Sequence, residues 1–155
     1  MSMCKTLAAT ILAGTMLFAG SAAAADKAPS GTASSKDGKA MELVQEWDKV
    51  FPRSDKVEHR KVTFRTRYGT VLAGDLYVPR DARGKLAALA VSGPFGAVKE
   101  QSSGLYAQKM AELGFFAIAF DPSYTGESGG TPRYVASPDI NTEDFCAAVD
   151  FLSVQ

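Results

Sequence analysis

Two glycine-rich segments of the sequence carry residue types and spacings that could do chemistry. Gly126–Gly130 reads Gly-Glu-Ser-Gly-Gly and matches Gly-x-Ser-x-Gly, a pattern that presents a serine nucleophile when a strand leads directly into it and a helix leaves directly from it. Ser92–Gly96 reads Ser-Gly-Pro-Phe-Gly and directly follows an apolar run, so its backbone N–H groups could stabilise an oxyanion. Both segments point to acyl-transfer chemistry.

The context of Ser128 disfavours its assignment as a nucleophile. Residues 122–125, followed by Gly126 of the pattern itself, lie between Asp121, where the preceding strand is predicted to end, and the serine, and Gly130–Pro132 cannot start a helix cleanly. In a strand–turn–helix elbow the acid and the histidine follow the serine, whereas the only histidine of the sequence, His59, precedes it. We therefore interpret the segment as a turn-rich loop that shapes a substrate pocket, and we find neither the nucleophile nor the general base in this sequence.

The Ser92–Gly96 segment has two interpretations. Pro94 has no N–H, so Phe95 is the first candidate for a backbone donor to an oxyanion and Gly96 is the second. The alternative is a tight strand-to-helix turn that needs glycine and proline for its geometry alone.

Three other side chains could take part in chemistry, and each has a simpler structural interpretation. His59 lies in a predicted strand of the amino-terminal hairpin, which favours a surface or half-buried residue. Cys146 lies among apolar residues of a predicted helix and is expected to be a small core residue. Asp121 is expected to brace the loop that follows it. No Cys/His cluster supports a zinc site.

The hydrophobic pattern predicts the strands that position these residues. Alternation over 57–67 and 70–79, with Gly69 between them, predicts an antiparallel hairpin. The apolar runs 86–91 and 115–120 fit parallel strands buried on both faces and joined by a right-handed crossover. We expect the last of these strands to leave an unpaired apolar edge.

Helical spacing predicts three helices, over 41–51, 103–113 and 142–152. The first would pack on the body through Trp47. The last would bury the apolar side chains of Phe145, Val149 and Leu152.

The amino terminus has the pattern of a secretory signal peptide. One positive charge, a short apolar stretch and an Ala-x-Ala run predict a signal peptide over residues 1–25, followed by a flexible linker over 26–40. A membrane anchor is the alternative, but the apolar stretch is short for a span of about 20 residues. Cys4 precedes that stretch, which disfavours a lipoprotein. We therefore expect a periplasmic or secreted protein with no membrane contact after cleavage.

The charge balance argues against nucleic acid as a partner. The sequence contains 17 Lys and Arg against 17 Asp and Glu, so no large single-sign field is available to capture a polyanion. The pairs Arg60-Lys61 and Arg65/Arg67 are interpreted as the solvated face of a strand.

Three segments together resemble exported bacterial α/β-hydrolases of the dienelactone-hydrolase-like group: Ala90–Gln108, Phe120–Gly130 and Ser137–Phe145. The resemblance runs from about Phe51 to Leu152. It implies a partial α/β-hydrolase fold of class α/β, in which an antiparallel amino-terminal hairpin leads into a parallel sheet with flanking helices. It also implies that residues 41–155 form the amino-terminal half of such a domain.

The resemblance further implies hydrolysis of small esters or related acyl compounds, with no metal or organic cofactor. Only the oxyanion-loop role transfers to residues of this sequence, namely Phe95 or Gly96, and Tyr124 becomes a substrate-pocket residue. The leading hypothesis is a truncated ester or acyl hydrolase that is inactive alone. The alternatives are a non-catalytic periplasmic binding or interaction module that self-associates through the open sheet edge, and a gene fragment with an unstable product.

Overall fold

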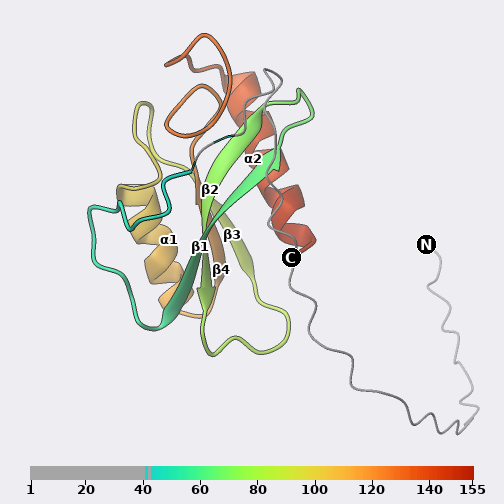
Figure 1. The fold of residues 1–155 in the computed structure, drawn as a ribbon. Helices are drawn as coiled ribbons and strands as arrows, with labels where there is room; N and C mark the ends of the chain where they lie inside the picture. Colours follow the sequence, from blue (N-terminus) through green and yellow to red (C-terminus); the bar gives the residue numbers. More distant parts are fainter. Residues whose placement is uncertain (1–40, 42) are drawn as a thin grey trace, which may run out of the picture.

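The computed structural model describes residues 41 and 43–155 (Figure 1). The predicted signal peptide, the predicted linker and Cys4 lie outside the described residues. Within these residues the elements follow one another as β1 (Val57–Arg65), β2 (Val71–Pro79), β3 (Ala88–Val91), α1 (Ser102–Glu112), β4 (Phe116–Phe120) and α2 (Pro138–Ser153). The predicted hairpin, the parallel pair and two of the three predicted helices are therefore confirmed.

The strands form one mixed sheet in the order β1-β2-β4-β3. Strands β1 and β2 are antiparallel, with Lys61 opposite Asp75, and the hairpin turns at Gly69, whose φ of 86° favours glycine. Strand β4 pairs antiparallel with β2 and parallel with β3. The prediction that the last strand forms the open edge is wrong: β4 lies inside the sheet, and the edge strand is β3. The crossover through α1 places β3 outside β4.

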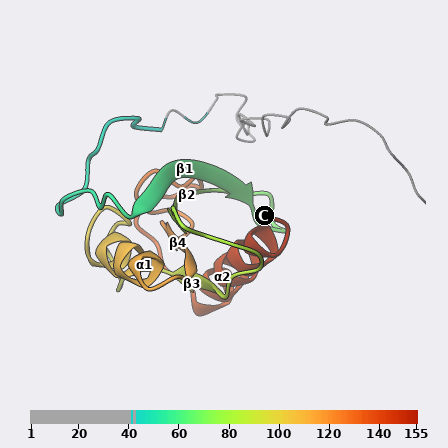
Figure 2. The ribbon, with the colours of Figure 1, turned by 90° about the horizontal axis from the view of Figure 1, so that it is seen from below.

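The two helices cover opposite faces of the sheet (Figure 2). Because side chains alternate along a strand, each strand contributes to two apolar cores. The core under α2 contains Phe64, Leu72, Leu76, Ile118, Phe120, Ala147, Ala148 and Leu152. The core under α1 contains Phe51, Val57, Tyr77, Ala107, Ala111, Ala117 and Ala119. The parallel pair β3–β4 therefore lies between two helices, with one apolar core on each face of the sheet. Among the described residues, no helix has the length and apolar character needed to span a membrane.

The predicted helix over 41–51 is wrong, because the described part of that segment is not helical. Its backbone bonds to the body instead of to itself: Val44 N–H donates to Glu127 Oε1 at 2.8 Å, and Val50 N–H donates to the carbonyl of Glu100 at 3.2 Å. Trp47 does anchor the segment, and its Nε1–H donates to the carbonyl of Phe51 at 2.8 Å. Tertiary hydrogen bonds have replaced the helical ones that the sequence spacing suggested.

Helix α2 begins earlier than predicted and buries a different face. Pro138 occupies its first turn, where a missing N–H costs nothing. The inward positions are the small residues Ala147 and Ala148 together with Leu152, while Phe145 and Val149 are 41% and 55% exposed. Cys146 is also exposed, so the prediction of a core cysteine is wrong.

Two acidic residues of α2 set that rotation. Asp144 accepts the N–H and the hydroxyl of Ser123 at 2.8 and 2.7 Å, and Glu143 accepts Arg67 N–H at 2.9 Å. Burial raises the pKa of Asp144, and the Ser123 hydrogen bonds act against that rise. The two carboxylates thus lie on the inward face of α2 with Ala147, Ala148 and Leu152, whereas the hydrophobic pattern predicted Phe145, Val149 and Leu152 on that face.

Candidate active site

The loops that follow the parallel strands β3 and β4 meet at the carboxyl edge of the sheet, where ligands bind in open α/β sheets. They enclose a small cavity of about 110 Å³. Its lining residues are Gly93, Pro94, Phe95, Gly96, Ala97, Pro122, Thr125, Val135, Ala136 and Asn141. None of these side chains is ionisable. Both predicted donors, Phe95 and Gly96, therefore lie on the cavity wall, and the Phe95 ring is 79% exposed.

The β3–α1 loop makes a tight turn that leaves two backbone donors free. Ala97 N–H donates to the carbonyl of Pro94 at 3.0 Å, and Gly96 has a φ of 82°. A Cβ on Gly93 would lie 2.9 Å from that of Ala97, so the turn needs glycine there. Within the described part of the chain, the N–H groups of Phe95 and Gly96 have no acceptor. The tight-turn and oxyanion interpretations are thus compatible, and the catalytic role stays a prediction.

Ser128 is a structural residue in this loop, as its sequence context indicated. Its hydroxyl donates to the carbonyl of Asp121 at 2.6 Å and accepts Ala73 N–H at 2.9 Å, and the residue is 2% exposed. Strand β4 ends at Phe120 and α2 begins only at Pro138, so no strand–turn–helix elbow surrounds the serine. The hydroxyl donates one hydrogen bond and accepts another within the loop and strand backbone, and neither partner is a general base.

Asp121 braces the cavity loops, as predicted. Its Oδ1 accepts Lys99 N–H at 2.8 Å, while Oδ2 accepts Lys99 Nζ and Glu127 N–H, each at 2.9 Å. One fully buried carboxylate thus joins the β3–α1 loop to the β4–α2 loop. Gly126 has a φ of 53°, and a Cβ there would lie 2.2 Å from Oδ2, so the turn around the carboxylate needs glycine.

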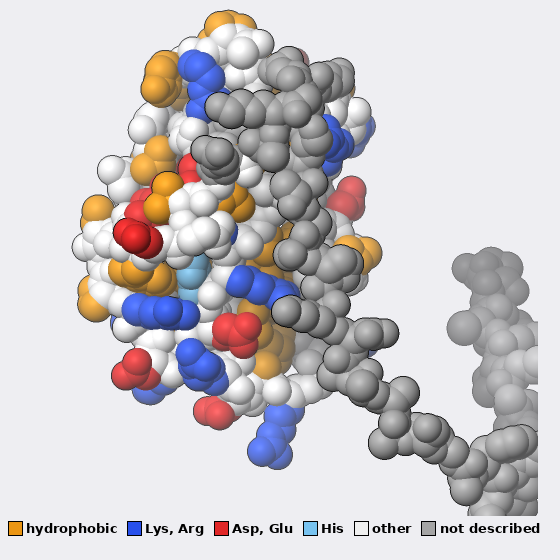
Figure 3. Space-filling view, in the orientation of Figure 1, with side chains coloured by type: hydrophobic (Ala, Val, Ile, Leu, Met, Phe, Trp, Pro, Cys, Tyr) orange, Lys and Arg blue, Asp and Glu red, His pale blue; other side chains and the backbone are white. Residues whose placement is uncertain are grey.

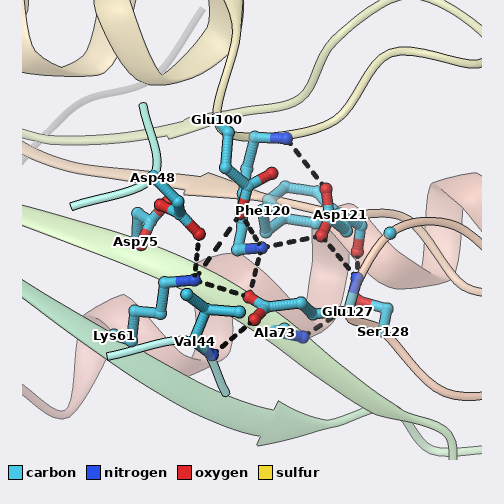
Figure 4. A network of polar contacts seen from close by, with 12 residues as sticks. Val44, Asp48, Lys61, Ala73, Asp75, Glu100, Phe120, Asp121, Glu127 and Ser128 are labelled. Carbon is cyan, nitrogen blue, oxygen red and sulfur yellow. Dashed lines mark hydrogen bonds and ion pairs between the residues drawn. The ribbon is translucent and has the colours of Figure 1, made fainter. Parts of the chain in front are cut away.

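A network of buried charges extends from this carboxylate across the α1 face of the sheet (Figure 4). It comprises Lys49, Lys61 and Lys99 with Asp48, Asp75, Glu100, Asp121 and Glu127. Lys61 pairs with Asp48 at 2.9 Å and Glu127 at 2.8 Å, and its side chain is only 4% exposed. The prediction that Lys61 lies on a solvated face is therefore wrong. The alternation of β1, which groups Lys61 with Val57 and His59, is the sequence signal for this inward position.

The network shifts the pKa values of its members in a consistent direction. Burial acts to lower the pKa of Lys99, but the Asp121 charge and the hydrogen bonds to Glu100 and Glu127 outweigh it and raise that pKa. Burial acts to raise the pKa of Asp48, but hydrogen bonds from Lys49 and Lys61 lower it from 3.8 to about 2. Lys99 and Asp48 are therefore charged near neutral pH.

His59 lies away from the cavity. Its Nε2 lies 2.8 Å from Asp75 Oδ1, its side chain is 13% exposed, and its ring meets Trp47 edge-on with a centroid separation of 5.1 Å. It stands opposite Tyr77, which in turn stands opposite Ala117 near the amino end of β4. The prediction of a half-buried strand histidine is confirmed, and this histidine cannot serve as a base at the carboxyl edge.

Tyr124 lies in the β4–α2 loop but does not line the small cavity. Its φ is 71°, and its ring packs so closely on Gly130 that a Cβ there would lie 2.5 Å from it. Its role in a substrate pocket stays a prediction. In the described part of the chain, no group of three or more His, Cys, Asp or Glu side chains could hold a metal ion.

Comparisons with known proteins show what this chain is similar to in sequence. No protein-family model matches the sequence. The uncharacterised protein PA2218 of Pseudomonas aeruginosa is 67% identical over 130 residues, which cover 81% of this chain and 35% of PA2218. The thiohydrolase aneE of Aspergillus aculeatus is 35% identical over 102 residues, which cover 66% of this chain and 31% of that protein. The chain therefore spans about a third of the length of these relatives.

Solved structures agree with the sequence matches. The crystal structure of PA2218 superposes with a TM-score of 0.73 and 69% identity, over 76% of this chain and 37% of that one. The α/β-hydrolase GrgF of Penicillium gives 0.55 at 28% identity, over 61% and 32% of the two chains. Esterase Pf2001 of Pyrococcus furiosus gives 0.53 at 19% identity, over 72% and 43%, and thereby supports the fold alone. The chain has a partial α/β-hydrolase fold, and its relatives include hydrolases of that fold.

Proposed function

We propose that residues 41–155 form the amino-terminal, oxyanion-loop half of an exported ester or thioester hydrolase of the dienelactone-hydrolase-like group. In this proposal the Phe95 N–H, with Gly96 as the alternative, donates to the oxyanion that forms when a nucleophile attacks the acyl carbon. The nucleophile and the histidine base come from residues outside this 155-residue sequence. The substrate is a small ester or acyl compound, and the mature protein is periplasmic or secreted.

One observation carries this proposal: Phe95 and Gly96, whose backbone N–H groups have no acceptor among the described residues, line a cavity at the carboxyl edge of a parallel strand pair. Donors that are fixed in advance at the position of developing charge are usually the largest contribution to acyl-transfer catalysis. The relationship to a protein named thiohydrolase at 35% identity supports the same chemistry.

The test uses a chimera in which this chain replaces the matching segment of PA2218, assayed on short-chain esters and thioesters. We expect turnover by PA2218 and by the chimera, and only background from the 155-residue chain alone, because its single histidine is paired with Asp75. Phe95→Pro, which removes the N–H, should lower kcat by about 10²–10³. No turnover by PA2218 and the chimera would refute the hydrolase proposal.

Two controls separate the backbone donor from its surroundings. Phe95→Ala removes the exposed ring and keeps the N–H, so it should retain far more activity than Phe95→Pro. Ser128→Ala removes two buried hydrogen bonds and should cost about 1–3 kcal/mol of stability, with turnover per folded molecule retained. Loss of turnover in folded Ser128→Ala would instead identify the serine as the nucleophile.

A second candidate function, a non-catalytic module that self-associates, is favoured by the contrast between the two sheet edges. Edge strand β1 presents the exposed charges of Glu58, Arg60 and Arg65, which discourage pairing, whereas β3 consists of Ala88–Val91 alone. A groove of about 590 Å³ runs beside β3 and is lined by apolar residues that include Leu86, Phe116 and Val149.

Sedimentation equilibrium tests this second function. Concentration-dependent dimerisation that is abolished by Leu89→Lys on β3 would support it, and a monomer throughout the micromolar range would contradict it. The partner is not nucleic acid in either proposal. Figure 3 shows that basic and acidic side chains are interspersed over the coloured part of this face, where no large patch of a single sign is present.

A further inference from the structure

The side chain of Glu127, the second residue of the Gly-x-Ser-x-Gly motif, joins three parts of the chain. Its Oε1 accepts Val44 N–H at 2.8 Å, and its Oε2 accepts Lys61 Nζ at 2.8 Å and Lys99 Nζ at 2.6 Å. Its own N–H donates to Asp121. The carboxylate is 18% exposed, so these contacts lie largely out of water. A motif that serves no nucleophile here thus has a different use.

The described part of residues 41–51, here called the strap, is hydrogen-bonded to the β3–α1 loop and to the β4–α2 loop. Val44 reaches the β4–α2 loop through Glu127, and Val50 N–H reaches the β3–α1 loop at the carbonyl of Glu100, 3.2 Å away. Between these contacts, Asp48 pairs with Lys61 at 2.9 Å. The strap is therefore bonded at separate points to each of the two loops that supply the cavity lining.

Lys99 connects Glu127 to the predicted oxyanion donors. It lies three residues after Gly96, its side chain is fully buried, and both its N–H and its Nζ bond to Asp121. Glu127 binds the same Nζ. Removing the Glu127 charge leaves a buried ammonium with one partner fewer, and the segment that carries Gly96 is fixed through that ammonium.

We propose that Glu127 is a positioning residue, which couples the docking of the strap to the orientation of the Phe95 and Gly96 N–H groups. The catalytic meaning of this coupling rests on the proposed function. The coupling itself is a property of the described residues and can be measured without any turnover.

The experiment compares amide spectra of the ¹⁵N-labelled 155-residue chain with those of Glu127→Gln, which keeps the size of the side chain. We expect the Val44, Phe95 and Gly96 signals to shift together. Lys99 N–H, which donates to Asp121, should exchange on the order of tenfold faster, because the Lys99 ammonium loses its charged Glu127 partner and holds the segment less firmly. Glu127→Asp, which retains the charge, should return the signals toward those of the natural chain.

Glu112→Gln is the matched control, because it removes an exposed pair with Lys109 on α1 and should leave the loop signals in place. Val44→Pro removes the Val44 N–H, which donates to Glu127, at a half-exposed position. It tests the coupling if Glu127→Gln does not fold. Unchanged Phe95 and Gly96 signals in either folded variant would overturn the coupling. Shifted signals in a chimera that lacks hydrolysis would leave the coupling intact and refute only the proposed function.

Discussion

Asp121→Asn is expected to destabilise the chain by about 3–5 kcal/mol, a large share of the 5–15 kcal/mol typical of a domain. The carboxylate is fully buried and accepts three hydrogen bonds, two of them from Lys99. An amide offers one acceptor oxygen and turns an N–H₂ group toward donors, so one donor is left unpaired. Urea denaturation followed by the fluorescence of Trp47, the only tryptophan, measures the loss.

Asp150→Asn provides the matched comparison. Asp150 lies on the exposed face of α2, where the same chemical change should alter stability by no more than about 0.5 kcal/mol. A loss of stability below about 1 kcal/mol in Asp121→Asn would contradict the bracing role. Such a small loss is typical of an exposed residue and not of a buried carboxylate that accepts three hydrogen bonds.

The second large effect is a stability plateau bounded by acid and by alkali. Asp48, Asp75 and Glu127 have lowered pKa values in the folded chain, where lysine and histidine partners outweigh burial. Each of these ionised carboxylates stabilises the fold fully above its unfolded pKa, which is near 4. The contribution is lost as the pH falls through the folded-state pKa, which for Asp48 is about 2. The free energy of unfolding should therefore fall steeply below about pH 4.

The lysines set the alkaline limit with the opposite sign. The pKa values of Lys61 and Lys99 are raised in the folded chain, so their contributions are complete below about pH 10 and are lost as the pH rises further. Asp144 opposes the acid loss, because its raised pKa makes its ionisation unfavourable to folding. Its favourable effect grows as the pH falls through its raised folded pKa and is complete below the unfolded value near 4, so it offsets part of the acid loss before the steep fall begins.

Urea denaturation from pH 2 to pH 11 measures both limits. Asp48→Asn should lower stability at pH 7 and flatten the acid limit, because it removes one of the groups that must take up a proton. Asp150→Asn should leave the profile unchanged. An acid limit with the same slope in Asp48→Asn would show that the network does not govern acid unfolding.

The sequence predicted the sheet because its apolar patterns are strong and local. The hairpin alternates with period two, and the runs before Ser92 and Asp121 are continuous, so tertiary packing agreed with the local signals. The cavity donors Phe95 and Gly96 could be placed for the same reason, because a turn that directly follows a buried strand must lie at the sheet edge. The absence of a strand directly before Ser128 and of a helix directly after it also predicted correctly that this serine does not lie in a strand–turn–helix elbow.

Sequence reasoning failed where long-range polar contacts decide. The strap has helical spacing of apolar residues, but its backbone bonds to Glu127 and Glu100. The charge pattern of β1 predicts a solvated Lys61, but its burial depends on Asp48 and Glu127, and Glu127 is distant in sequence. On α2, Asp144 and Glu143 displace the expected inward side chains for the same reason.

The bond between Val44 and Glu127 spans 83 residues of sequence, and this separation has a consequence for how the chain folds. The hairpin β1–β2 contains mostly local contacts and can form as soon as its residues are available. Lys61 and Lys99 of the network need Glu127 from the β4–α2 loop before they are fully paired, whereas Lys49 pairs with Asp48 and Asp75 alone. During synthesis these two cations therefore stay hydrated until residue 127 has emerged, which makes closure of the strap a late step and leaves the loop bearing Phe95 among the last parts to become rigid.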